Sequence, residues 1–149
     1  ERKGAIIAMS SVAGYAPVMG RTGYCASKYA MQGFFETLRS EVEDQGVQVL
    51  IACPSFVRTG IEQAALGGDG NQVNRARLAV GRPRLPDEVA EDIFQALIKG
   101  KRLTLLAGMA KLSYWVYRLF PNFYVGQMKR RIRPEFADDY AEDASTASR

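Results

Sequence analysis

The hydrophobic pattern of the chain alternates between strand-like and helix-like spacing over its first third. Two short apolar runs, residues 4–9 and 47–53, are typical of strands buried in a sheet. Between them, over residues 22–45, apolar side chains recur every three or four positions and predict a long helix with one polar face. Strand, helix and strand in this order predict a parallel sheet.

Glycine and proline interrupt the chain between residues 54 and 86, where only residues 61–66 hint at a helical turn. So long an irregular segment predicts a lid over a functional site or a disordered loop. Beyond it, the pattern predicts a helix, a third strand and two final helices, at residues 86–100, 103–107, 109–119 and 122–132.

The composition suits a globular α/β protein, since 47% of the 149 residues are hydrophobic and 24% are charged. Because the chain opens directly on a buried-type strand, we expect it to be a piece of something longer.

The chain has no histidine, which removes Ser-His-Asp and Cys-His catalysis and histidine-ligated metals from it. Acid–base chemistry must therefore use Tyr, Lys, Asp, Glu or Cys, and we expect no metal site. The two cysteines, Cys25 and Cys53, are expected to be reduced, buried thiols of a cytosolic protein.

The charge of the chain is concentrated near its C-terminus. Residues 99–134 contain nine Lys or Arg side chains and no acid, interleaved with aromatic residues, whereas residues 135–149 contain five acids and one Arg. Three roles fit the basic aromatic segment: packing over a substrate mouth, lying on anionic lipid, or binding nucleic acid. Nucleic acid is the least supported of the three because no recognition motif accompanies the charge. After residue 100 the longest uncharged stretch has ten residues, far below the ~20 needed to span a bilayer.

Candidate chemistry gathers where the first strand ends and the first helix begins. Ser10 and Ser11 follow the strand, at the kind of position where ligands bind in open α/β sheets. Tyr24 and Lys28 lie four residues apart, on one side of the predicted helix. A nearby ammonium favours the ionised form of a phenol, whose ordinary pKa is ~10, and so suits it to exchange protons with a substrate oxygen. Taken singly, the serines fit a turn equally well, and the Tyr–Lys pair fits an ordinary amphipathic helix.

The combination resembles the short-chain dehydrogenase/reductase family. Ser11 precedes Tyr24 by 13 residues, residues 24–28 read Tyr-Cys-Ala-Ser-Lys, and the second strand ends at Pro54. The resemblance covers the C-terminal half of that family's fold, from about residue 4 to 107. It implies an α/β fold with a doubly wound, Rossmann-type parallel sheet, of which this chain holds the C-terminal part with extra C-terminal helices. The resemblance and the charge pattern together predict three regions: a catalytic half-domain, a basic aromatic helical extension and an acidic tail expected to be disordered, at residues 1–107, 108–134 and 135–149.

The resemblance also implies roles for particular residues. Tyr24 is the implied catalytic acid–base, and Lys28 would stabilise its phenolate and hydrogen-bond the nicotinamide ribose. Ser11 would orient and polarise the substrate carbonyl. A bound nicotinamide cofactor would be lined by five residues: Tyr24, Lys28, Pro54, Val57 and Thr59. Residues 55–85 correspond to the family's substrate lid.

The resemblance therefore predicts a reversible, NAD- or NADP-dependent hydride transfer between a carbonyl and a secondary alcohol. Ser55 stands where the family usually has glycine, and the family's glycine-rich phosphate loop has no counterpart, so this segment alone is expected to be inactive. The aromatic segment gives a weak indication of an apolar substrate. We expect a homo-oligomer in the cytoplasm, without nucleic acid and with peripheral membrane contact left open. The rival hypothesis is a noncatalytic fragment or a membrane-peripheral module.

Overall fold

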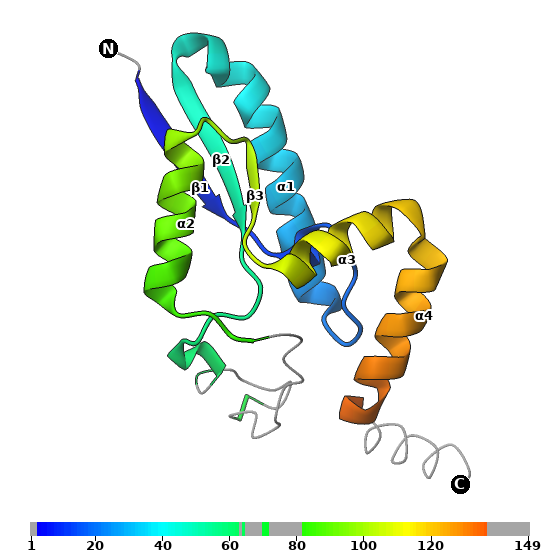
Figure 1. The fold of residues 1–149 in the computed structure, drawn as a ribbon. Coiled ribbons are helices and arrows are strands. Elements are labelled where there is room, and N and C mark those ends of the chain that lie inside the picture. Colours follow the sequence, from blue (N-terminus) through cyan, green and yellow to red (C-terminus); the bar gives the residue numbers. More distant parts are fainter. Residues whose placement is uncertain (1–2, 63, 65–69, 72–81, 137–149) are drawn as a thin grey trace, which may run out of the picture.

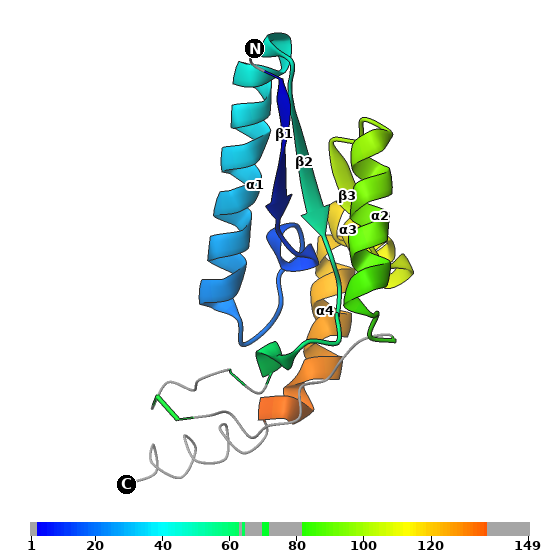
Figure 2. The ribbon, with the colours of Figure 1, turned by 90° about the vertical axis from the view of Figure 1, so that its left-hand side faces the viewer.

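A computed structural model describes residues 3–62, 64, 70–71 and 82–136 of the chain. Three strands, β1 (Gly4–Met9), β2 (Val47–Cys53) and β3 (Leu103–Leu105), form a parallel sheet in the order β1-β2-β3. Helix α1 (Thr22–Val42) covers one face of the sheet and α2 (Pro86–Ile98) covers the other (Figures 1 and 2). The predicted α/β fold with a parallel, Rossmann-type sheet is confirmed, as a partial fold.

The core is built on both faces of the central strand β2. Alternate side chains of a strand point to opposite faces, so Ile51 and Cys53 pack on the α1 side while Leu50 and Ala52 pack on the α2 side. All four are completely buried. Burial on both faces explains why this strand appears in the sequence as an unbroken apolar run.

Helix α1 is fastened to the sheet by a buried arginine. The guanidinium of Arg39 donates to the backbone oxygens of Val49 at 3.0 Å and Arg102 at 2.8 Å, and pairs with Glu36 at 2.8 Å. One side chain thus ties α1 to β2 and to the turn before β3. The helix predicted over residues 22–45 ends as a short 3₁₀ turn, η2 (Glu43–Gln45), and Gly46 reverses the chain with a φ of 78°.

The third strand is shorter than the predicted 103–107. It ends at Leu105 because Ala107 already caps the next helix, α3 (Gly108–Leu119). Helix α4 (Pro121–Ile132) follows directly, and α3 and α4 form an elbow beyond the carboxyl ends of the strands (Figure 1). Within the described ranges, no helix combines the length and apolar character required to cross a membrane.

Two predicted regions are described only in part. A short 3₁₀ turn, η3 (Gly60–Glu62), opens the predicted lid, and most of the lid between residues 63 and 81 lies outside the described residues. A short 3₁₀ turn, η4 (Arg133–Phe136), continues α4 into the first two residues of the predicted tail. The remainder, residues 137–149, is outside the described part of the chain.

Candidate active site

The carboxyl ends of the three strands meet at one edge of the sheet. The backbone N–H of Ser10 donates to the oxygen of Ala52 at 2.8 Å, which joins the ends of β1 and β2. The N–H of Leu106 donates to the oxygen of Cys53 at 3.1 Å and joins β3 to them. In open parallel sheets, this edge is where ligands bind.

The two serines that follow β1 have different surroundings. Ser10 is buried, and its hydroxyl accepts a 3.0 Å hydrogen bond from the side-chain amide of Gln32. The same amide nitrogen lies 3.4 Å from the sulfur of Cys53, whose pKa burial raises to about 11. Ser10 therefore belongs to a buried polar cluster that links α1 to the sheet.

Ser11 is half-buried and caps the 3₁₀ turn η1 (Val12–Gly14). Its hydroxyl oxygen accepts a 3.3 Å hydrogen bond from the backbone N–H of Ala13. A hydroxyl that accepts one hydrogen bond still has its own hydrogen to donate. The local geometry thus leaves Ser11 able to donate to a carbonyl oxygen.

Tyr24 and Lys28 lie in the first turns of α1. The ammonium of Lys28 donates to the backbone oxygen of Met9, the last residue of β1, at 3.0 Å, and lies 5.6 Å from the centre of the Tyr24 ring. Tyr24 itself is 47% exposed, so its phenol is accessible from solvent. Lys28 therefore holds the start of α1, with Tyr24, against the strand end that leads into Ser11.

Close packing between α1 and the loop after β1 depends on a glycine. A Cβ atom at Gly14 would lie 2.9 Å from both the backbone oxygen of Lys28 and the hydroxyl oxygen of Ser10. Real Cβ atoms do not approach other atoms so closely, so only glycine lets this loop touch the helix. The contact lets the loop after β1 pack directly against the backbone of α1 at Lys28.

The three predicted cofactor residues after β2 have no hydrogen bond to Tyr24 or Lys28 among the described residues. Pro54 follows the strand, Val57 packs against the α2-side core and Thr59 is exposed. Val57 also forms an isolated parallel bridge with Arg84, in which Arg58 N–H donates to Arg84 O at 2.8 Å. Arg84 thus joins the two ends of the predicted lid by backbone pairing.

Sequence reasoning missed Gly14, Gln32 and Arg84. Gln32 had a usable signal, because it continues the four-residue spacing from Tyr24 through Lys28 along α1. Gly14 and Arg84 had none, because each acts on segments far from it in the sequence.

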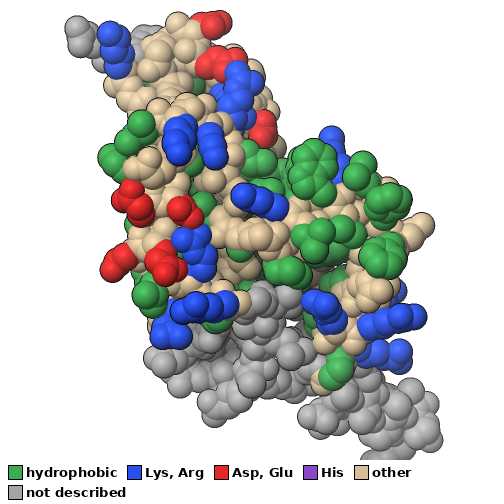
Figure 3. Space-filling model, in the orientation of Figure 1, with side chains coloured by type: hydrophobic (Ala, Val, Ile, Leu, Met, Phe, Trp, Pro, Cys, Tyr) green, Lys and Arg blue, Asp and Glu red, His purple; other side chains and the backbone are tan. Residues whose placement is uncertain are grey.

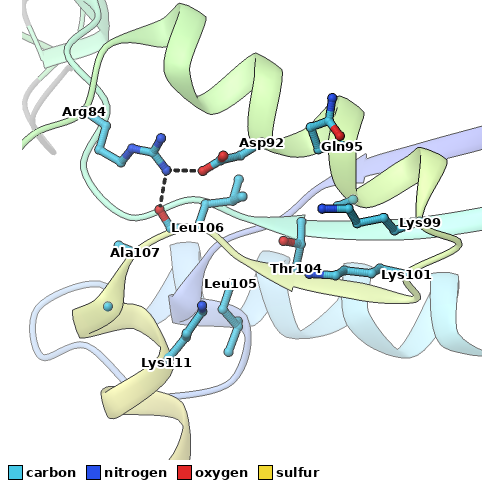
Figure 4. Close-up of a pocket in the computed structure, with 12 residues that line it drawn as sticks. Arg84, Asp92, Gln95, Lys99, Lys101, Thr104, Leu105, Leu106, Ala107 and Lys111 are labelled. Atoms are coloured by element: carbon cyan, nitrogen blue, oxygen red, sulfur yellow. Dashed lines mark hydrogen bonds and ion pairs between the residues drawn. The ribbon is translucent and has the colours of Figure 1, made fainter.

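A recess of about 340 Å³ lies between α2, β3 and the start of α3 (Figure 4). Its lining includes three lysines and the ion pair between Arg84 and Asp92, but none of the predicted site residues. Among the described residues, no three His, Cys, Asp or Glu side chains are grouped as metal ligands would be.

The parallel sheet, the helices on both of its faces and the polar corner at its carboxyl edge define an α/β protein of the Rossmann type. A family model described as short chain dehydrogenase matches residues 1–68. Two curated relatives are similar over most of the chain. "Dehydrogenase/reductase SDR family member 7B" of Bos taurus is 34% identical over 90% of this chain and 42% of its own length. "Dehydrogenase/reductase SDR family protein 7-like" of Anopheles gambiae is 32% identical over 87% of this chain and 41% of its own length.

Solved structures show the same fold. A short-chain dehydrogenase from Burkholderia cenocepacia, in complex with NADP, has a TM-score of 0.68 at 18% identity, over 85% of this chain and 47% of its own. A short-chain dehydrogenase from Streptomyces avermitilis has a TM-score of 0.62 at 23% identity, over 87% of this chain and 51% of its own. The chain belongs to the short-chain dehydrogenase/reductase family, and it spans about two fifths of the length of the curated relatives named above.

Proposed function

We propose that the protein is an NAD(P)-dependent oxidoreductase that interconverts a carbonyl and a secondary alcohol on a small molecule, with Tyr24 as the acid–base. The observation that carries the proposal is the Tyr24–Lys28 pair, with Lys28 anchored to Met9 O at the end of β1. The names of the relatives, all dehydrogenase/reductases, favour this enzyme over a noncatalytic module.

Tyr24 would move the proton. In the reducing direction its hydroxyl gives a proton to the substrate oxygen, and in the oxidising direction its phenolate takes the proton back. Ser11 would donate a second hydrogen bond to the same oxygen, using the hydrogen that its capping role leaves free. Two donors on one oxygen stabilise the negative charge that develops there.

Lys28 would support Tyr24 from a fixed position. An ammonium has three hydrogens to donate, and two of them are directed to Met9 O at 3.0 Å and Met31 Sδ at 3.6 Å. The third is left for a ribose hydroxyl.

The described residues fit the nicotinamide end of a dinucleotide. Tyr24 and Lys28, with Pro54, Val57 and Thr59 after the neighbouring strand, would hold it at the carboxyl edge of the sheet. When bound, the nicotinamide supplies or accepts the hydride. The structural neighbours include one in complex with NADP and a 4-hydroxyisoleucine dehydrogenase complexed with NADH at a TM-score of 0.51, which supports either dinucleotide. The homo-oligomer, the cytoplasmic location and the apolar substrate expected from the sequence stay predictions.

The proposal is tested by Tyr24→Phe in the full-length protein, with a panel of aliphatic and aromatic ketones and either NADH or NADPH. Loss of the proton donor should lower kcat by about 10²- to 10⁴-fold while the Kd of the dinucleotide stays within threefold. Tyr29→Phe is the matched control, because it removes a phenolic hydroxyl group five residues further along α1. Turnover by Tyr24→Phe within twofold of the parent would refute the assignment.

A further inference from the structure

The α3–α4 elbow has one face packed on the rest of the molecule. The ring of Tyr114 meets that of Tyr15 edge-on, with centroids 5.2 Å apart, and Ala110 is buried. On α4, the sulfur of Met128 accepts a 3.2 Å hydrogen bond from the backbone N–H of Met19. These contacts fix the inner face of the elbow against the loop between β1 and α1.

The opposite side of the elbow is apolar and open to solvent. Its large hydrophobic side chains are each more than half exposed, and we call them the outer face: Leu112, Trp115, Leu119, Phe120 and Phe123. The three on α3 are spaced three and four residues apart, which places them along one side of that helix. Figure 3 shows hydrophobic side chains gathered over α3 and the start of α4. A contiguous exposed apolar patch marks a surface that binds something.

Positive charge surrounds this outer face. Lys111 and Arg118 are exposed on α3 beside the apolar stripe, and residues 129–131 add three exposed cations on α4. Residues 99–134 contain no acid, and residues 99–149 still carry ten basic against five acidic side chains. Apolar and aromatic side chains beside Lys and Arg are the pattern of helices that lie on lipid.

We propose that the outer face binds the surface of an anionic lipid bilayer, with α3 lying along the interface. Trp115 and the two phenylalanines would enter the headgroup boundary, and the flanking Lys and Arg would contact lipid phosphates and carboxylates. A second copy of the chain is the weaker partner, because two outer faces would bring their cations together with no acid on either elbow to pair them. This proposal is independent of the chemistry at Tyr24.

Trp115 is the only tryptophan of the 149-residue chain, so its fluorescence reports directly on the outer face. We would add vesicles of phosphatidylcholine, with or without one third phosphatidylserine, and follow the emission and co-sedimentation of the chain. The expected result is a blue shift and co-sedimentation with the anionic vesicles, both far weaker with neutral ones. Raising the salt concentration should weaken binding, because screening acts on the charged part of the contact.

Two variants separate the apolar and charged contributions. Leu119→Asp should abolish the blue shift and the co-sedimentation. The triple variant Lys129→Gln/Arg130→Gln/Arg131→Gln should weaken anionic vesicle binding on the order of a hundredfold, at about fivefold per cation. The triple variant changes only exposed side chains, so it remains informative if Leu119→Asp fails to fold. Phe94→Asp is the matched control, since Phe94 is a comparably exposed apolar residue on α2.

Three outcomes would overturn the proposal. The first is an unchanged Trp115 emission with anionic vesicles at millimolar lipid. The second is a blue shift that grows with protein concentration in the absence of lipid, which would assign the outer face to a second copy. The third is equal loss of binding in Phe94→Asp and Leu119→Asp, which would show that general apolar exposure drives the association.

Discussion

The close contact between the loop after β1 and helix α1 at Lys28 requires that residue 14 have no side chain. The loop after β1 touches the backbone of α1 at Gly14, and the ammonium of Lys28 reaches Met9 O from the same turn of the helix. The neighbouring Gln32 amide fills the space beside them by bonding Ser10. At the scale of single residues, the candidate site thus depends on a glycine and a glutamine that have no chemistry of their own in the proposed reaction.

Gly14→Ala tests this close contact. The new methyl group would lie 2.9 Å from the Lys28 backbone oxygen, so α1 or the loop must move, which should cost about 1–3 kcal/mol of unfolding free energy. Gly33→Ala is the control, because a Cβ there meets nothing within 4 Å and alanine favours a helix by about 1 kcal/mol. Urea denaturation measures both. Equal stabilities of the two variants would contradict the packing described here.

At the scale of elements, Arg84 joins segments that the predicted lid separates. Its backbone pairs with residues 56 and 58 next to β2, while its guanidinium pairs with Asp92 on α2 at 2.5 Å and donates to Leu106 O after β3 at 3.1 Å. One residue therefore connects the start and end of the lid with α2 and the sheet. The exposed pair between Arg102 and Glu43 also joins distant segments, but solvent screens it.

The contrast predicts different costs for two similar substitutions. Arg84→Gln should lower the unfolding free energy by about 1–2 kcal/mol, because the part-buried backbone oxygen of Leu106 loses its charged donor, whereas solvent can replace the donor to the half-exposed Asp92. Arg102→Gln should cost less than about 1 kcal/mol, as exposed ion pairs do. Thermal and urea unfolding of both variants decide the point. A larger loss in Arg102→Gln than in Arg84→Gln would mean that Arg84 does not hold these elements together.

At the scale of the whole molecule, the described chain provides one end of a dinucleotide site. None of its described strand-to-helix turns has the glycine-rich form that binds a pyrophosphate at a helix N-terminus. The two curated relatives, whose names describe them as dehydrogenase/reductases or members of that family, are more than twice as long as the region that matches this chain. The proposed activity therefore belongs to the whole protein.

The 149-residue chain alone should not oxidise NADH or NADPH with any ketone of the panel. Because no described strand-to-helix turn has the glycine-rich form that binds a pyrophosphate, the nicotinamide end should bind too weakly for calorimetry to detect at millimolar dinucleotide. The full-length protein, assayed beside it, should bind and turn over. A micromolar Kd for the isolated chain would show that the residues described here suffice for binding.

The sequence by itself determined the elements, the parallel sheet and the Tyr24–Lys28 pair. Hydrophobic periodicity and helix spacing are local properties, so β1 and β2 were predicted with the bounds that the structure has. The third strand was predicted two residues too long, because an apolar run does not show where a following helix takes its cap.

Only the tertiary structure decided which distant segments touch. Gln32 bonds Ser10 across 22 residues of sequence, and Met128 meets Met19 across 109. No local sequence pattern encodes such contacts, because they depend on how the helices pack against the sheet and against one another. For the same reason, the sequence showed a basic aromatic segment but not its two faces. Packing against Tyr15 and Met19 selects the side chains that are buried, and it leaves Trp115 and its neighbours exposed.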